Sequence, residues 1–125
     1  MTEPEGRIAL LELGQEELQR FLVEGLQEPA YRAGQLYEWL YSSLVWDYSQ
    51  MTNLPKPLRE KLTTLAPLPK ILALEEHTST DGLTTKTLFQ LEDGECIEAV
   101  LMGHGERHTA CLSAQAGCAI GCPFC

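Results

Sequence analysis

Three cysteines near the end of the sequence have the type and spacing to do chemistry. Cys118, Cys122 and Cys125 form a C-x₃-C-x₂-C pattern. Three thiolates on one short loop can hold three irons of a cubane iron–sulfur cluster, and the fourth iron then stays open to a substrate-like ligand. The spacing therefore predicts a cluster loop with these three cysteines as ligands.

Two other interpretations of this loop stay open from the residues alone. A zinc site would need a fourth ligand, which Cys111 or His108 could supply, although structural zinc sites usually have two separated ligand pairs. Cys122 and Cys125 could instead form a thioredoxin-like redox pair. That chemistry uses a helix directly after the pair, and no residue follows Cys125 in this sequence. The cluster is favoured over both.

The residues before position 68 show the period of short helices. We expect one helix over residues 15–26, a second from Pro29 to about residue 43, and a third from Pro55 or Pro57 to residue 65. Simple core packing explains the apolar stripes, whereas base stacking by Trp39, Tyr41 and Trp46 is the alternative. The stripes consist of Leu18, Phe21, Leu22, Leu26, Leu36, Tyr37, Trp39, Leu40, Leu44, Leu58, Leu62 and Leu65.

After Pro69 the apolar pattern changes to period two. This pattern predicts strands at 70–77, 84–91, 96–102 and 108–113, with turns at Asp81-Gly82 and Asp93-Gly94. The sequence thus predicts an α+β protein with a helical domain at 1–68 and a β segment at 69–125.

The charge is negative overall but unevenly distributed. A formal net charge of −9 argues against non-specific binding of nucleic acid over the whole surface. Only residues 29–70 are net positive, with five basic against three acidic side chains. Lys56, Arg59 and Lys61 in this segment are the candidate phosphate contacts, although such a group is often only a solvated helix face.

The sequence shows neither a signal peptide nor an apolar run of the roughly 20 residues that a membrane span needs. We therefore expect a cytoplasmic protein without a membrane partner. In a reducing compartment, clustered thiols favour metal binding or catalysis over a disulfide framework.

Three motifs in order carry a resemblance to a known family. They are residues 35–41 (QLYEWLY), residues 51–56 (MTNLPK) with Leu58-Arg59 close behind, and residues 111–118 (CLSAQAGC) followed by the cluster loop. From about residue 8 to its end the sequence resembles the RlmN/Cfr family of radical S-adenosylmethionine (SAM) RNA methyltransferases. Ala114 is one departure, since the family usually has a second serine there.

The resemblance implies a fold and a cofactor set. Residues 1–68 would be a three-helix accessory domain that helps to hold RNA. The rest would be a small β-hairpin segment, then the first strand and the cluster loop of a partial (β/α) barrel that this chain truncates after Cys125. Cys118, Cys122 and Cys125 would ligate a [4Fe–4S] cluster whose open iron binds SAM, and an electron donor would reduce it. The chain alone is expected to be inactive and monomeric.

The resemblance also implies an activity and roles for two residues. The expected activity is methylation of C2 of a specific adenosine in 23S rRNA and in some tRNAs through a methyl-cysteine intermediate. Glu98 matches the proton acceptor, and Cys111 matches the cysteine that forms a transient disulfide with a methyl-carrying cysteine absent from this chain. A C8-specific Cfr-type enzyme and a non-enzymatic metal- or RNA-binding module are the alternatives.

Without the resemblance, these residues would have ordinary structural roles. Glu98 would be a solvated strand residue, and Cys111 a small buried hydrophobic residue. Cys96 matches no role in the family and is expected in the core. The three histidines are expected in loops or on the surface: His77, His104 and His108.

Overall fold

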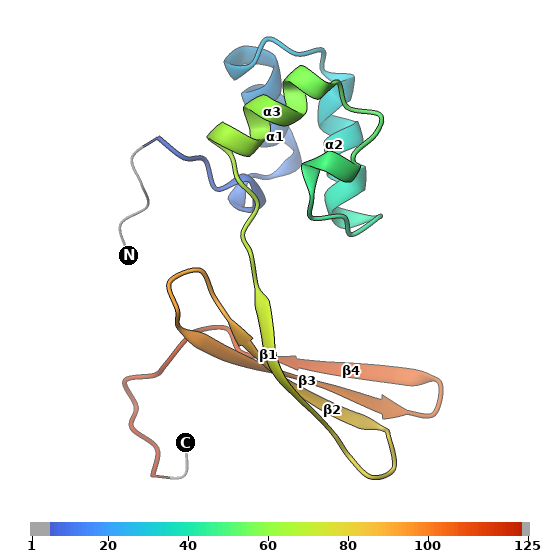
Figure 1. The fold of residues 1–125 in the computed structure, drawn as a ribbon, viewed down its shortest axis with the longest axis vertical. Helices are drawn as coiled ribbons and strands as arrows, with labels where there is room; N and C mark the ends of the chain where they lie inside the picture. Colours follow the sequence, from blue (N-terminus) through green and yellow to red (C-terminus); the bar gives the residue numbers. More distant parts are fainter. Residues whose placement is uncertain (1–5, 124–125) are drawn as a thin grey trace. The chain divides into compact units, whose positions relative to one another are not determined.

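The computed structural model describes residues 6–123. In this part of the chain, three α-helices precede a four-stranded antiparallel sheet, which confirms the α+β class (Figure 1). The chain divides into two compact units between Leu68 and Pro69, and each is described by itself. Phe124 and Cys125, the third predicted cluster ligand, lie outside the described residues.

The helical unit contains α1 (Gln15–Arg20), α2 (Tyr31–Tyr41) and α3 (Lys56–Leu65). A π-helical turn, η2 (Phe21–Gly25), continues α1 without a break. The N-terminus of α1 is closed by the Glu17 carboxylate, which accepts a hydrogen bond of 2.9 Å from the Gly14 N–H. Helix α3 starts after Pro55, with Pro57 in its first turn, where a missing N–H costs nothing.

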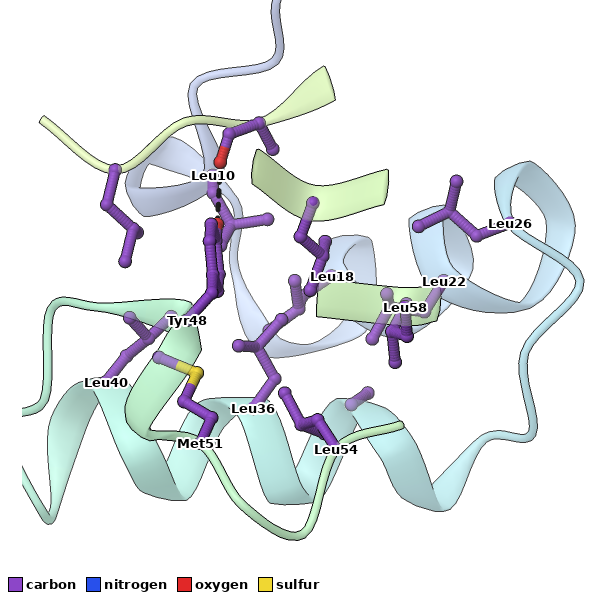
Figure 2. Packing of buried hydrophobic residues seen from close by; sticks show 14 residues of the cluster. Leu10, Leu18, Leu22, Leu26, Leu36, Leu40, Tyr48, Met51, Leu54 and Leu58 are labelled. Atoms are coloured by element: carbon purple, nitrogen blue, oxygen red, sulfur yellow. Dashed lines mark hydrogen bonds between the residues drawn. The ribbon is translucent and has the colours of Figure 1, made fainter. Parts of the chain in front are cut away.

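A leucine-rich core joins the three helices (Figure 2). Leu22, Leu36 and Leu62 are completely buried, as the helical periodicity predicts. Tyr48, in the connection between α2 and α3, brings a polar hydroxyl into this apolar core. The hydroxyl donates a hydrogen bond of 2.6 Å to the Ala66 carbonyl (Figure 2). The buried residues are Leu10, Leu18, Leu22, Leu26, Ala33, Leu36, Leu40, Tyr48, Met51, Leu54, Leu58, Leu62, Ala66 and Leu68.

The sequence pattern was wrong about Leu44, which it placed in the apolar stripe of the second helix. Helix α2 ends at Tyr41, and Leu44 is 65% exposed with a positive φ of 53°, in the left-handed region. The chain reverses there, since the Val45 N–H donates to the Trp39 carbonyl at 2.9 Å. Tyr41 and Trp46 are also exposed, so neither belongs to the core.

The sheet unit is a meander in the order β1-β2-β3-β4. Its strands are β1 (Leu72–Thr78), β2 (Thr84–Gln90), β3 (Cys96–His104) and β4 (Arg107–Leu112). The predicted turns join the first three strands: the Gly82 N–H donates to Ser79 O at 2.9 Å, and the Gly94 N–H to Leu91 O at 3.0 Å. The four strands expected from period-two alternation are therefore confirmed, with bounds shifted by one or two residues.

Within residues 69–123 every side chain is exposed or only half-buried. Cys96 is exposed, so its expected place in the core is wrong. The three histidines are exposed, as predicted. Strand β4 pairs antiparallel with β3, and the barrel that the family resemblance implies stays a prediction.

Candidate functional site: one face of the sheet and the cysteine loop

The register of the sheet brings the two predicted catalytic residues to one face. Cys111 on β4 pairs with Val100 on β3, and Glu98 lies two residues before Val100. Paired residues of an antiparallel sheet share a face, as do residues two apart on one strand. Glu98 and Cys111 are therefore diagonal neighbours, a relation with a typical separation of roughly 7–8 Å in sheets.

Lys86 on β2 joins the same group. It pairs with Val100 from the other side, and its Nζ lies 3.6 Å from Glu98 Oε1. Sequence reasoning missed this lysine. The signal that could have found it is the length of the Asp93-Gly94 hairpin, because the turn fixes which residues of β2 and β3 face each other.

The backbone of Glu98 is held where β3 and the end of β4 meet. Ser113 N–H donates to the Glu98 carbonyl at 3.1 Å, and the Ser113 hydroxyl donates to the same carbonyl at 2.8 Å. The Glu98 N–H in turn donates to Ser113 Oγ at 3.3 Å. These bonds fix the main chain of Glu98, and its carboxylate remains available to pair with Lys86.

Cys111 is exposed and its thiol is free, so the interpretation as a buried hydrophobic residue is wrong. His108, three residues earlier, pairs with Gly103 and lies on the opposite face of the sheet from Cys111. Cys111 and His108 therefore cannot both turn toward one ion on a single face.

The cysteine loop after β4 turns at two glycines. Gly117 and Gly121 directly precede Cys118 and Cys122, and both have positive φ angles of 82° and 68°. These left-handed conformations favour glycine. The Ile120 N–H donates to Cys118 Sγ at 3.5 Å, and such bonds stabilise a thiolate ligand and tune a cluster.

The thiols of the loop that the structure describes are accessible to a metal or cluster. Cys118 is exposed, Cys122 is half-buried, and both are free thiols. No three His, Cys, Asp or Glu side chains gather around a possible metal position in residues 6–123. Residues 6–123 alone therefore form no cluster site, and Cys125, the third predicted ligand, lies outside this range.

Residues of the motifs at 35–41 and 51–56 make hydrogen bonds that fix the connection between α2 and α3. Trp39 Nε1 donates to Asn53 Oδ1 at 2.5 Å, and Arg32 Nη1 donates to the Asn53 carbonyl at 2.9 Å. The same Arg32 nitrogen donates to Gln35 Oε1 at 2.8 Å. Asn53 thus ties residues of α2 to the segment before α3, and the half-buried Trp39 is engaged in this network.

The three predicted RNA contacts differ in their surroundings. Arg59 Nη1 donates to the Ser49 carbonyl at 2.9 Å, so this guanidinium braces the same connection as Arg32. Lys56 lies 3.9 Å from Glu60 in an exposed i,i+4 pair. Lys61 is exposed. Lys56 and Lys61 are therefore more accessible to a phosphate than Arg59.

None of the helices in residues 6–123 has the length and apolar character that crossing a membrane requires.

Most of this chain resembles known proteins in sequence and in fold. Residues 8–68 match the ribosomal RNA large subunit methyltransferase N-terminal domain family. A probable dual-specificity RNA methyltransferase RlmN from Dictyoglomus thermophilum is 46% identical over 108 residues, which are 85% of this chain and 30% of that protein. The corresponding protein of Bacillus cytotoxicus is 49% identical over 109 residues, 87% of this chain and 30% of its own length.

A solved structure shares the fold. The crystal structure of a radical SAM methyltransferase from Sphaerobacter thermophilus superposes with a TM-score of 0.84 at 46% identity, over 94% of this chain and 34% of that one. The chain therefore belongs to the RlmN/Cfr family of radical SAM RNA methyltransferases, as the sequence motifs predict. It spans about a third of the length of the relatives that it matches.

Proposed function

We propose that this chain is the N-terminal part of a methyltransferase that modifies C2 of a specific adenosine in 23S rRNA and in some tRNAs. The observation that supports the proposal most is the shared face of Glu98 and Cys111 in a chain that belongs to this family. The relatives named above are RlmN proteins, which favours C2 over the C8 specificity of a Cfr-type enzyme.

In this proposal each unit has a separate task. Residues 1–68 form the accessory domain that helps to hold RNA, with exposed Lys56 and Lys61 as phosphate contacts and Arg59 as a further candidate. Residues 69–125 lead into a partial (β/α) barrel that lies largely outside this chain. The fragment alone is expected to be inactive, since the methyl-carrying cysteine and most of the SAM site would belong to that barrel.

The cysteine loop would hold the cofactor. Cys118, Cys122 and Cys125 would ligate a [4Fe–4S] cluster, which with bound SAM supplies the radical chemistry that an electron-poor ring carbon requires. The Ile120 N–H already donates to Cys118 Sγ, which would stabilise the thiolate. A reductant of the cytoplasm would supply the electron.

The sheet face would hold the residues that finish the reaction. The Glu98 carboxylate would accept the ring proton at one of its oxygens. The Cys111 thiolate would attack the sulfur of the methyl-carrying cysteine, so that an S–S bond forms as the S–C bond to the RNA breaks. The electron pair of that S–C bond stays on the carbon, which then takes a proton. Cys111 is free and exposed, as this attack requires.

The test is to join this chain to the rest of its reading frame, reconstitute the cluster without oxygen, and add SAM with 23S rRNA fragments or tRNA. Mass spectrometry of the digested RNA is expected to show 2-methyladenosine. Low-temperature EPR is expected to show a reduced cluster signal that changes with SAM and disappears in Cys118→Ala. The result that would overturn the proposal is stoichiometric zinc with no cluster, and 8-methyladenosine would overturn the C2 assignment alone.

A Cys111→Ala variant separates the two proposed residue roles. We expect it to retain the EPR signal and to release no methylated RNA, because the covalent protein–RNA species could not be resolved. Release of product at the unsubstituted rate would contradict the role of Cys111.

A further inference from the structure

Lys86 is the only side chain that the structure pairs with the Glu98 carboxylate within residues 6–123. Its Nζ lies 3.6 Å from Glu98 Oε1, and both residues flank Val100 on the face that carries Cys111. The pair crosses from β2 to β3, so it depends on the register of the sheet. The main chain of Glu98 is fixed separately by Ser113.

The exposure of the pair argues against a role in stability. The side chains of Lys86 and Glu98 are 50% and 53% exposed. Exposed ion pairs contribute roughly 0–1 kcal/mol, since water screens the charges and side-chain entropy is lost. A glutamate has three rotatable side-chain bonds, however, so a neighbouring cation can limit the positions of its carboxylate at little cost in stability.

The other charged groups on this face have their own partners or lie further away. His77 shares the row of Lys86 and Val100, but its Nε2 lies 3.4 Å from Glu75 Oε2. Arg107 is at the far end of β4, opposite His104. Lys86 is therefore the cation placed to act on Glu98.

We propose that Lys86 is a positioning residue that orients the Glu98 carboxylate on the Cys111 face of the sheet. The inference rests on the proposed function, because Glu98 needs an orientation only if it accepts a proton from a bound base. Misplacing a reacting group can lower a rate by up to about 100-fold. Lys86 would act through Glu98 and would not touch the reacting atoms.

The test compares Lys86→Met with Lys86→Arg in the cluster-loaded, full-length protein. We expect Lys86→Met to lower kcat about tenfold with KM for the RNA nearly unchanged, because orientation and not binding is lost. Lys86→Arg keeps a cation near Glu98 and should recover most of the rate. Lys70→Met, which removes an exposed lysine outside the strands, is the matched control for the loss of one positive charge.

A double substitution tests whether Lys86 acts through Glu98. Lys86→Met combined with Glu98→Gln should be no slower than Glu98→Gln alone, since the orientation of a missing carboxylate has no effect. Fully additive losses would overturn the inference. So would a raised KM with unchanged kcat, which would make Lys86 an RNA contact.

A measurement on the metal-free 125-residue chain separates this inference from the proposed function. In NMR spectra of the lysine ammonium groups, Glu98→Gln should shift the Lys86 signal and leave that of Lys70 in place. No shift would show that the pair does not form. If the pair forms but the unsubstituted full-length protein fails to methylate RNA, the proposed function falls and the positioning role falls with it. If that protein is active and Lys86→Met is equally fast, only the positioning role is overturned.

Discussion

The helical unit and the sheet unit use their apolar residues in opposite ways. Within residues 6–68, the helical unit encloses fourteen buried residues in one core, among them Leu22, Leu36 and Leu62. In residues 69–123 no side chain is buried, and large apolar residues such as Leu101 and Leu112 are exposed. The residues with proposed chemistry, in contrast, lie in the sheet unit and the loop after it.

This difference indicates that the helical unit stabilises its own fold, whereas the sheet unit exposes the residues with proposed chemical roles. Polar side chains of the helical unit are engaged in bracing, as Arg32, Asn53 and Arg59 show. Polar side chains of the sheet unit, such as Lys86 and Glu98, meet on an open face. Substitutions of core and bracing residues in the first unit should therefore change stability, whereas substitutions on the sheet face should change activity.

The largest expected effect is at the centre of the helical core. Leu62→Ala should lower the free energy of unfolding by about 2–5 kcal/mol, because it leaves a cavity among fully buried leucines. The matched change in the sheet unit, Leu112→Ala at a side chain that is 71% exposed, should cost less than about 0.5 kcal/mol. Urea unfolding followed by circular dichroism measures both, and equal losses would break the comparison.

The next effect is at Tyr48, whose hydroxyl donates to the Ala66 carbonyl. Tyr48→Phe should cost about 1 kcal/mol at neutral pH, since it leaves a buried carbonyl without its donor. Burial raises the pKa of Tyr48, so the folded state favours the protonated phenol. Its contribution is complete below the unfolded pKa of about 10 and is lost as the pH rises above it.

Unfolding measured from pH 7 to pH 11 tests this alkaline dependence. The unsubstituted chain should lose stability above about pH 10, and the difference from Tyr48→Phe should shrink there. A difference that stays constant over this range would contradict a raised pKa.

A smaller effect is expected at Asn53, whose hydrogen bonds tie α2 to the segment before α3. Asn53→Ala removes the acceptor of Trp39 Nε1 and should cost about 0.5–1.5 kcal/mol, because water can replace part of the lost bond at this exposed position. Thr52→Ala, at the exposed neighbouring residue, is the control. A shift of tryptophan fluorescence in Asn53→Ala alone would support the contact, and identical spectra would contradict it.

The smallest effect is in the first turn of the sheet unit. Hydrogen bonds from the Ser79 hydroxyl and then from the Leu83 N–H lower the pKa of Asp81. The ionised form therefore stabilises the turn above the unfolded pKa of about 3.9, and this contribution is lost as the pH falls through the lower folded value. The Leu83 amide signal should move in acid, and should not move in Asp81→Asn. An amide that stays in place down to pH 2 in the unsubstituted chain would contradict this.

The local pattern of the sequence determined much of this protein. The 3.6-residue and two-residue periods predict three helices and four strands, because a periodic apolar face depends only on neighbouring residues. The motifs at 35–41, 51–56 and 111–118 identify the family. The glycines before Cys118 and Cys122 are also visible in the sequence, and they have the conformations that a turning loop needs.

The tertiary structure alone decided which distant residues meet. It shows that Trp39 and Arg59 brace the connection between α2 and α3, and that Leu44 leaves the second helix at a chain reversal. It also places Lys86 beside Glu98 on the face of Cys111. The physical reason is register: a shift of one residue between β2 and β3 would move Lys86 to the other face, and no local pattern contains that choice.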